Sequence, residues 1–246
     1  MANLAQNLLG VPVLIGKNRV KSISEAINKW GTQVAILDDG FQYLKLVHDI
    51  DIVTIDSTKP FGLNYLLPRG YLREPLSVLK NAGIILLTRT DQCKNLGEVR
   101  SRLDTIAPNV PRFESVHQPT SLTQADTNQN LGLDYIKEKK ILAICGIANH
   151  SSFIETLRSL NPTEITPIYF ADHHEYTNNN IDGIGKKAIE TNADMIITTE
   201  KDAHKIMKII VCPVLVLKIE LKLIGSSTDK FMELIRQKCK LSNQSL

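Results

Sequence analysis

Short apolar runs alternate with segments of helical periodicity along this sequence, and that alternation restricts its fold more than any other feature. Runs such as 84–88 and 141–145 have the length of buried strands. Between such runs, apolar residues recur every three or four positions, as in the stretch 96–106 before Pro108. Strands that alternate with helices form parallel sheets covered by helices on both faces. The sequence therefore predicts an α/β fold.

The same periodicities place the individual elements. The predicted strands are 11–15, 34–37, 50–55, 84–88, 141–145, 165–170, 195–198 and 211–217. The predicted helices are 22–30, 76–82, 96–106, 153–160, 181–189 and 231–239. Ser22 and Glu25 form a capping-box pattern at the start of the first helix, and Gly31 is expected to end it. Because residues 118–131 are polar and poor in large apolar side chains, we predict a linker there between two parts, 1–120 and 130–246.

Composition excludes several classes of protein. The 246 residues are 43% hydrophobic and 22% charged, which argues against disordered and fibrous chains. The four cysteines include no C-x-x-C pair, so a zinc ribbon or a redox dithiol has no support. No apolar run approaches the roughly 18 residues of a membrane-spanning helix. The net charge of +3 does not demand a nucleic-acid surface, and we expect no nucleic-acid partner.

Charged and polar residues follow most of the predicted strands. In parallel sheets, ligands bind beyond the carboxyl ends of the strands, so these residues are the first candidates for a site. The residues that follow the strands, several of them charged or titratable, are Asp38, Asp39, Asp56, Arg89, Thr90, Asp91, Gly146, Ile147, Ala148, Asn149, Asp172, His173, His174, Thr199, Glu200, Lys201 and Asp202.

Asp38 and Asp39 close a run of four apolar residues, which is the Walker-B pattern. A carboxylate at such a strand end holds Mg²⁺, directly or through water, beside the phosphates of a nucleotide. The alternative is a turn, because Asp-Asp-Gly is also a good turn sequence.

Residues 66–75 read LLPRGYLREP and form a loop stiffened by proline and glycine. Arg69 and Arg73 carry guanidinium groups that suit phosphates and other planar anions, and Glu74 stands beside them. The alternative is a solvated loop, because glycine and proline commonly mark loops.

Asp172 and His173 form the simplest general-base pair, in which a carboxylate orients an imidazole and stabilises its charged form. With His174, the histidines are alternatively metal ligands or surface residues near the start of a helix. Downstream, Thr199 and Asp202 are placed to cap a helix.

One nucleotide-binding signal is absent from the 246 residues. A Walker-B carboxylate normally works with a G-x-x-x-x-G-K-[ST] loop that cradles the phosphates. Gly16-Lys17 has no glycine at the required offset and is followed by Asn18, so it does not qualify.

Taken together, these motifs resemble the tetraacyldisaccharide 4′-kinases, the lipid A 4′-kinases of Gram-negative-type envelopes. The resemblance runs from about Gly10 to at least Lys205 and includes, in order, ILDDGFQ, DIDIVTID, LLPRGYLREPLSVLK, CGIA, FADHHEYT and TTEKDAHK. It is most specific in the DDGFQ and LPRGYLREP segments.

The resemblance implies a P-loop kinase that transfers the γ-phosphate of ATP, with Mg²⁺, to the 4′-hydroxyl of a lipid A disaccharide 1-phosphate. Its implied place is the cytoplasmic face of the inner membrane, as a peripheral protein. The fold expected here is a parallel-sheet P-loop-kinase-like domain, incomplete because its P-loop is missing, plus a smaller α/β domain.

By motif match, the resemblance also implies roles for individual residues. Asp38 and Asp39 are expected near nucleotide and metal, with Asp39 also catalytic. The expected catalytic histidine and its partner, and the expected contacts to substrate or phosphate, are His173, Asp172, Gln42, Arg69, Arg73 and Glu74.

This sequence departs from the family pattern in places. Tyr43 stands where the family usually has histidine after DDGFQ, and His48 stands where it usually has arginine. The family carries a P-loop, a membrane-associating helix and a G-D-E-P segment with its catalytic aspartate ahead of the part that matches. We therefore expect an N-terminally truncated member that does not phosphorylate at a useful rate by itself.

Two alternatives stay open on the residues. One is a metal-dependent phosphoesterase that uses Asp172, His173 and His174 as ligands, although the LPRGYLREP loop has no role in it. The other is an inactive remnant that folds and binds a lipid or a partner.

Overall fold

Seven strands form the sheet of this protein, in the order β1-β2-β3-β7-β6-β4-β5. The computed structural model describes residues 10–240 apart from 173, 207–208, 210 and 226. Every neighbouring pair is parallel except β3 with β7, which confirms the predicted α/β class. The strands are β1 (Ile52–Asp56), β2 (Ile84–Thr88), β3 (Arg112–Gln124), β4 (Lys140–Cys145), β5 (Glu164–Tyr169), β6 (Met195–Thr199) and β7 (Val214–Leu223).

Helices connect most of these strands. The α-helices are α2 (Arg19–Trp30), α3 (Leu96–Ile106), α4 (His150–Arg158), α5 (Asn178–Glu190), α6 (Glu200–Ile206) and α7 (Ser227–Cys239). The short 3-10 helices are η1 (Gly62–Asn64), η2 (Leu76–Asn81), η3 (Thr90–Gln92) and η4 (Leu133–Ile136). Within the described part of the chain, no helix has the length and hydropathy that crossing a membrane requires.

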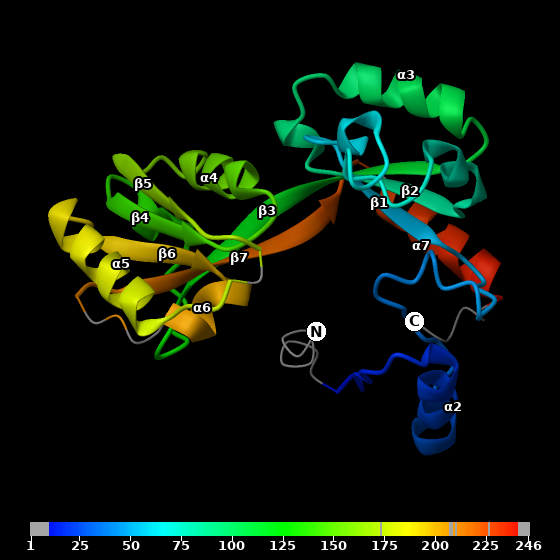
Figure 1. Cartoon of the computed structure of the whole chain (residues 1–246), viewed down its shortest axis with the longest axis horizontal. Helices are drawn as coiled ribbons and strands as arrows, with labels where there is room; N and C mark the ends of the chain where they lie inside the picture. The colour runs from blue at the N-terminus through cyan, green and yellow to red at the C-terminus, as the bar shows by residue number, and fades with distance from the viewer. Residues whose placement is uncertain (1–9, 173, 207–208, 210, 226, 241–246) are drawn as a thin grey trace.

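The elements form two lobes joined by a two-stranded ribbon (Figure 1). In the first lobe, β1, β2 and the start of β3 pair in parallel. In the second lobe, β5, β4, β6 and the start of β7 pair in parallel. Strand β3 continues from one lobe into the other, and β7 runs antiparallel to it from Ser115↔Leu223 to Gln124↔Leu215. One hydrogen-bonded ladder therefore connects the lobes.

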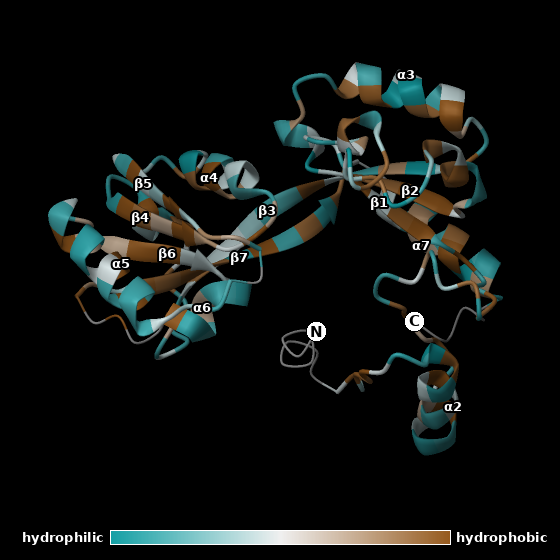
Figure 2. Cartoon of the chain, in the orientation of Figure 1, coloured by the Kyte–Doolittle hydropathy of each residue, from teal (hydrophilic) through white to brown (hydrophobic). Residues whose placement is uncertain are grey.

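Each lobe has its own hydrophobic core. In the second lobe, successive residues of β4 point to opposite faces, with Ala143 packed on the α4 side and Ile144 on the α5 side. Figure 2 shows β4 and β6 as largely hydrophobic, as expected of strands buried on both faces. In the first lobe, Ile85 and Leu87 of β2 pack with Leu103 of α3.

Helix α7 returns to the first lobe although it ends the described chain. The ring of Phe231 meets that of Phe113 on β3 edge to face, with 5.1 Å between centroids. Figure 1 shows α7, in red, within the first lobe, where it packs on β3. The first lobe is therefore built from two stretches that are more than a hundred positions apart in the sequence.

Two predicted strands do not form. Residues 11–15 and 34–37 have no regular structure, and Ile15 and Ile36 are 62% and 93% exposed. A run of four or five apolar residues becomes a strand only when a neighbouring strand satisfies its backbone groups. Among the described residues no strand pairs with either run, so both predictions are wrong for this structure.

Helix α2 forms as predicted at its end but not at its start. Gly31 ends it in the left-handed region at φ 63°. It begins before Ser22, at Arg19, because the side chain of Asn18 accepts a hydrogen bond from the backbone N–H of Lys21. The predicted capping box is therefore wrong. None of the residues of α2 is buried, so the face we expected to pack, which includes Ile27 and Trp30, is at most partly buried.

The predicted linker, 118–131, is also wrong in its first half. Strand β3 extends to Gln124, and its polar residues pair with β7 along the ribbon. Polar composition predicted a loop because one side of this ribbon meets solvent, which a β-strand tolerates. The division into domains 1–120 and 130–246 stays a prediction.

Candidate functional site

The two acidic residues of DDGFQ lie in a turn rather than at the end of a strand. Asp39 has a left-handed backbone with φ 53°, and both aspartates are exposed. The Arg73 Nη1 donates to both carboxylate oxygens of Asp39, at 3.0 and 2.8 Å. These bonds, and with them the negative charge, raise the pKa of Arg73. Arg19 of α2 donates from Nη1 to the backbone carbonyl of Asp38 at 2.7 Å.

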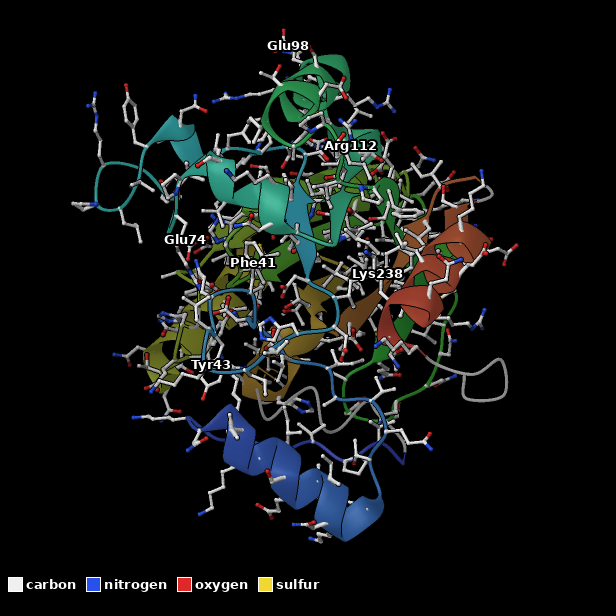
Figure 3. The ribbon with its side chains drawn as sticks, turned by 90° about the vertical axis from the view of Figure 1, so that its right-hand side faces the viewer. Phe41, Tyr43, Glu74, Glu98, Arg112 and Lys238 are labelled. Atoms are coloured by element: carbon white, nitrogen blue, oxygen red, sulfur yellow. The ribbon has the colours of Figure 1, made fainter. Side chains whose placement is uncertain are left out.

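The structure thus brings together two motifs that lie 34 positions apart, although the four apolar residues before Asp38 form no strand. Figure 3 shows Glu74 near Phe41, with Tyr43 farther along the same segment, in agreement with the bond from Arg73 to Asp39. Glu74 is half-buried and Gln42 is exposed. Their predicted roles stay predictions.

The LPRGYLREP loop owes its rigidity to a buried glycine. A side chain at Gly70 would place its Cβ 2.3 Å from the carbonyl oxygen of Tyr65 and 2.6 Å from that of Gly62. The Gly70 N–H donates to the Leu66 carbonyl at 3.0 Å. Only glycine permits this close approach of backbone to backbone. The turn holds Arg69 with its guanidinium 3.8 Å from the centre of the Tyr65 ring.

In the second lobe, Asp172 forms an ion pair that the sequence did not reveal. The ammonium group of Lys201 donates to Asp172 Oδ1 and also approaches the carbonyl of Gly146 at 3.5 Å. Strands β5 and β6 flank β4, so the residues that follow all three meet at one edge of the sheet. That strand order could not be read from the sequence. His173, the predicted catalytic histidine, lies outside the described residues.

The other histidine of this motif has a structural environment. His174 Nε2 lies 3.0 Å from Asn180 Oδ1, and its ring stacks on Phe170. In the described part of the chain, no three His, Cys, Asp or Glu side chains are grouped to hold a metal ion. The phosphoesterase alternative therefore gains no support.

Thr199 caps α6 together with Asp202, as predicted, and Asp202 also holds a second segment. Thr199 Oγ1 accepts from the Asp202 N–H at 3.3 Å and donates to Asp202 Oδ2 at 3.0 Å. Asp202 Oδ2 also accepts from the Gly146 N–H at 2.8 Å, and Asp202 is 0% exposed. Burial, with the Asp202 charge, raises the pKa of Cys145 to about 12 and that of Tyr176 well above its usual range. The carboxylate thus holds the loop between β4 and α4.

A cluster of contacts around Asp56, the Asp56 cluster, joins the ends of β1 and β2 to the second lobe. The Asp56 carboxylate accepts from Arg89 Nη1 and Asn149 Nδ2, both at 2.8 Å, and from Thr58 Oγ1 at 2.7 Å. Burial alone would raise the pKa of Asp56, but these bonds and the Arg89 cation outweigh burial and lower it. Burial and the Arg89 charge lower the pKa of His117 nearby. The strand-end rule had marked Asp56, Arg89 and Asn149 but not their contact.

A cavity of about 1020 Å³ lies beside this cluster. The loops after β1 and β2, with the start of α3, form one wall, and α4 along its length forms the other. It is therefore bounded by both lobes, at the carboxyl ends of the first lobe's parallel strands, where sheets of this class bind ligands.

Comparisons with known proteins identify the family that this chain matches. The family model described as tetraacyldisaccharide-1-P 4′-kinase, LpxK, matches residues 2–240. A tetraacyldisaccharide 4′-kinase of Syntrophus aciditrophicus is 36% identical over 89% of this chain and 61% of its own length. One of Halothermothrix orenii is 36% identical over 82% of this chain and 56% of its own length. The chain thus spans about six tenths of the curated relatives it matches.

A solved structure shares the fold. It is the crystal structure of LpxK from Aquifex aeolicus in complex with ATP, with a TM-score of 0.60 and 24% identity. The match covers 91% of this chain and 63% of that one. The likeness confirms the kinase-like α/β fold. With a family model that matches nearly its whole length, the chain belongs to the tetraacyldisaccharide-1-P 4′-kinase family.

Proposed function

We propose that this chain serves the ATP-dependent phosphorylation of the 4′-hydroxyl of a tetraacyldisaccharide 1-phosphate, a lipid A precursor. Family membership over residues 2–240 is the observation that carries this proposal. The Asp39–Arg73 contact supports it, because it joins the two most specific motifs of the sequence. The place we propose is the cytoplasmic face of the inner membrane, where the chain acts as a peripheral protein on a lipid substrate.

Asp38 and Asp39 are the proposed residues near Mg²⁺ and nucleotide. Mg²⁺ keeps several waters and uses one or two carboxylates together with substrate phosphates. Two adjacent, exposed carboxylates fit that requirement. When bound with ATP, Mg²⁺ neutralises charge on the transferred phosphate. Asp39 would then exchange its contact with Arg73 for the metal, which frees the guanidinium for an anion.

The remaining proposed roles concern position and proton transfer. Phosphoryl transfer depends mainly on holding the reactants in line and on neutralising charge. We assign contacts to substrate or phosphate to Gln42, Arg69 and Glu74. His173 is the proposed catalytic histidine, and Asp172, held by Lys201, is its proposed partner.

We also propose that 1–120 and 130–246 act as separate domains of the enzyme. Two independent cores support this division. Within this division we propose one exception, α7, which we count with the first domain because its Phe231 packs on Phe113.

The test is an assay of radiolabelled γ-phosphate transfer to the tetraacyldisaccharide 1-phosphate. The N-terminal part of the Syntrophus aciditrophicus relative, where the resemblance places the phosphate loop, is fused ahead of residue 10. We expect transfer by the fused protein and a loss of about a hundredfold or more in kcat for Asp39→Asn. Asp182→Asn, an exposed change on α5, is the matched control and should leave the rate unchanged. A folded fusion without transfer would contradict the proposal.

The 246-residue chain alone gives the complementary measurement. It contains no G-x-x-x-x-G-K-[ST] loop, whose amides and lysine hold the phosphates, so we expect weak ATP binding by calorimetry. Micromolar binding with clear turnover would show that other residues replace the loop.

A further inference from the structure

The N-terminus of α4 is one point, apart from the β3–β7 ladder, at which the second lobe contacts the first. Asn149, 8% exposed, donates from Nδ2 to Asp56 Oδ2 at 2.8 Å and to Thr58 Oγ1 at 2.9 Å. Asp56 ends β1 of the first lobe, and Asn149 precedes α4 of the second. The two residues are 93 positions apart, so this contact exists only when the lobes are docked.

The acceptor of this bond is itself fixed. Asp56 Oδ2 also receives Arg89 Nη1, and Asp56 Oδ1 receives both the hydroxyl and the N–H of Thr58, the latter at 3.0 Å. A carboxylate held on several sides does not rotate away, so it presents one oxygen to the second lobe. Hydrogen bonds to a charged acceptor are also stronger than neutral ones.

The donor is equally constrained. Asn149 Oδ1 accepts from the Ser152 N–H at 3.2 Å and so caps α4. The side-chain oxygen therefore faces its own helix, and the amide nitrogen faces the other lobe. An aspartate would cap the helix equally well but would bring a second carboxylate against Asp56.

A second bond between the lobes follows along α4. Gln92 Nε2 of η3 donates to Thr156 Oγ1 at 3.1 Å. Gln92 and Thr156, like Thr58 and Asn149, line the cavity between the lobes. The same bonds that join the lobes therefore set the width of that cavity.

We propose that Asn149 is a positioning residue that locks the second lobe onto the first through the Asp56 carboxylate. This lock fixes where the second lobe carries Asp172 and Lys201 relative to Asp39 and Arg73 on the first. Its role in catalysis rests on the proposed kinase function, whereas its role in holding the lobes does not.

Small-angle X-ray scattering of the 246-residue chain tests the lock without any turnover. In Asn149→Asp, α4 keeps its cap, but repulsion from Asp56 should part the lobes and increase the radius of gyration and the maximum dimension. Helix content by circular dichroism should not change. Thr177→Ala is the matched control, because it removes the N-cap of α5 in the same lobe without touching the first lobe.

A polarity swap provides the rescue. In Asn149→Asp with Asp56→Asn, the new amide donates to the new carboxylate, and Arg89 keeps an anion beside it. We expect this double variant to regain the compact scattering profile. Asn149→Ser, which caps α4 but cannot reach Asp56, is the second single variant and should also expand.

Wild-type scattering from both single variants would overturn the proposal, and so would a double variant as expanded as Asn149→Asp. If the lock behaves as expected while the fused protein shows no phosphate transfer, the proposed function fails and the lock stands. If transfer occurs but the single variants stay compact, the lock fails and the function stands.

Discussion

The second lobe and the segment 10–47 carry the same kind of sequence signal but differ in structure. In both, a short apolar run ends at polar or acidic residues. In the second lobe, 195–199 lies between two parallel strands, and four of its five residues are buried. In the N-terminal segment, 34–37 has no strand beside it among the residues that the structure describes, and Ile36 is 93% exposed.

The difference shows that an apolar run is not sufficient to form a strand. Its side chains favour burial, but its backbone groups need neighbours, and those neighbours come from distant parts of the chain. The same holds for α2 and α4. Both have apolar periodicity and an asparagine cap, yet α4 packs Phe153 and Leu157 into a core whereas α2 buries none of its residues.

The largest expected effect contrasts the two regions directly. Ile144→Ala removes a 0% exposed side chain from β4 and should lower the free energy of unfolding by about 2–5 kcal/mol. The same substitution at Ile36 should change it by less than about 0.5 kcal/mol. Urea unfolding measures both. A large loss at Ile36 would mean that the N-terminal segment packs in solution.

The next effect asks whether exposure implies loose structure. Gly70→Ala forces a Cβ against two backbone carbonyls of an otherwise exposed loop and should cost about 1–3 kcal/mol. Gly97→Ala on α3 meets no atom within 4 Å and should stabilise by up to about 1 kcal/mol. Thermal melts of the two variants should therefore move in opposite directions. Equal melting temperatures for the two variants would show that the 66–75 loop is no more rigid than the segment 10–47.

A smaller effect concerns the stability of the folded chain at acidic pH. In the unfolded chain the Asp56 carboxyl binds its proton near pH 4, and in the folded chain its pKa is lower. Between these two pKa values the unfolded state holds more protons than the folded state. The contribution of the Asp56 carboxylate to stability is therefore complete above about pH 4, and it is lost as the pH falls through the folded pKa. Asp56→Asn should flatten this acid dependence in urea titrations. An unchanged slope would show that the contacts of Asp56 do not lower its pKa in the folded chain.

The smallest effect on stability belongs to the pair that matters most for the proposed chemistry. The side chains of Arg73 and Asp39 are 61% and 66% exposed, so Arg73→Lys should alter stability by less than about 0.5 kcal/mol. In the fused protein it should still lower phosphate transfer, because an ammonium group cannot replace a planar guanidinium. Full transfer in this variant would count against a phosphate contact.

Sequence reasoning worked where local pattern and burial agree. The strands at 84–88 and 195–198 and the helix at 96–106 were each placed within a residue. It failed at β3, whose residues 118–124 look like a linker, because a ribbon is stabilised by cross-strand pairing that composition does not express.

The candidate site shows the same limit. The strand-end rule picked out Asp56, Asn149 and Lys201, since a parallel sheet gathers such residues at one edge. It could not pair them, because the partners depend on the strand order and on how the lobes dock. The contact between Arg73 and Asp39 likewise depends on how two loops fold together, although both residues lie in the most specific motifs.

The path of β3 through both lobes also affects the order in which the lobes fold while the chain is translated. Its partner β7 begins 90 residues after β3 ends, and Phe231 of α7 completes the packing on Phe113. Contacts between such distant positions form slowly, because a long loop must close first. On the ribosome, β1 to β3 therefore emerge about a hundred residues before α7, the helix that packs on β3. The first lobe begins to fold before the second lobe and is completed after it.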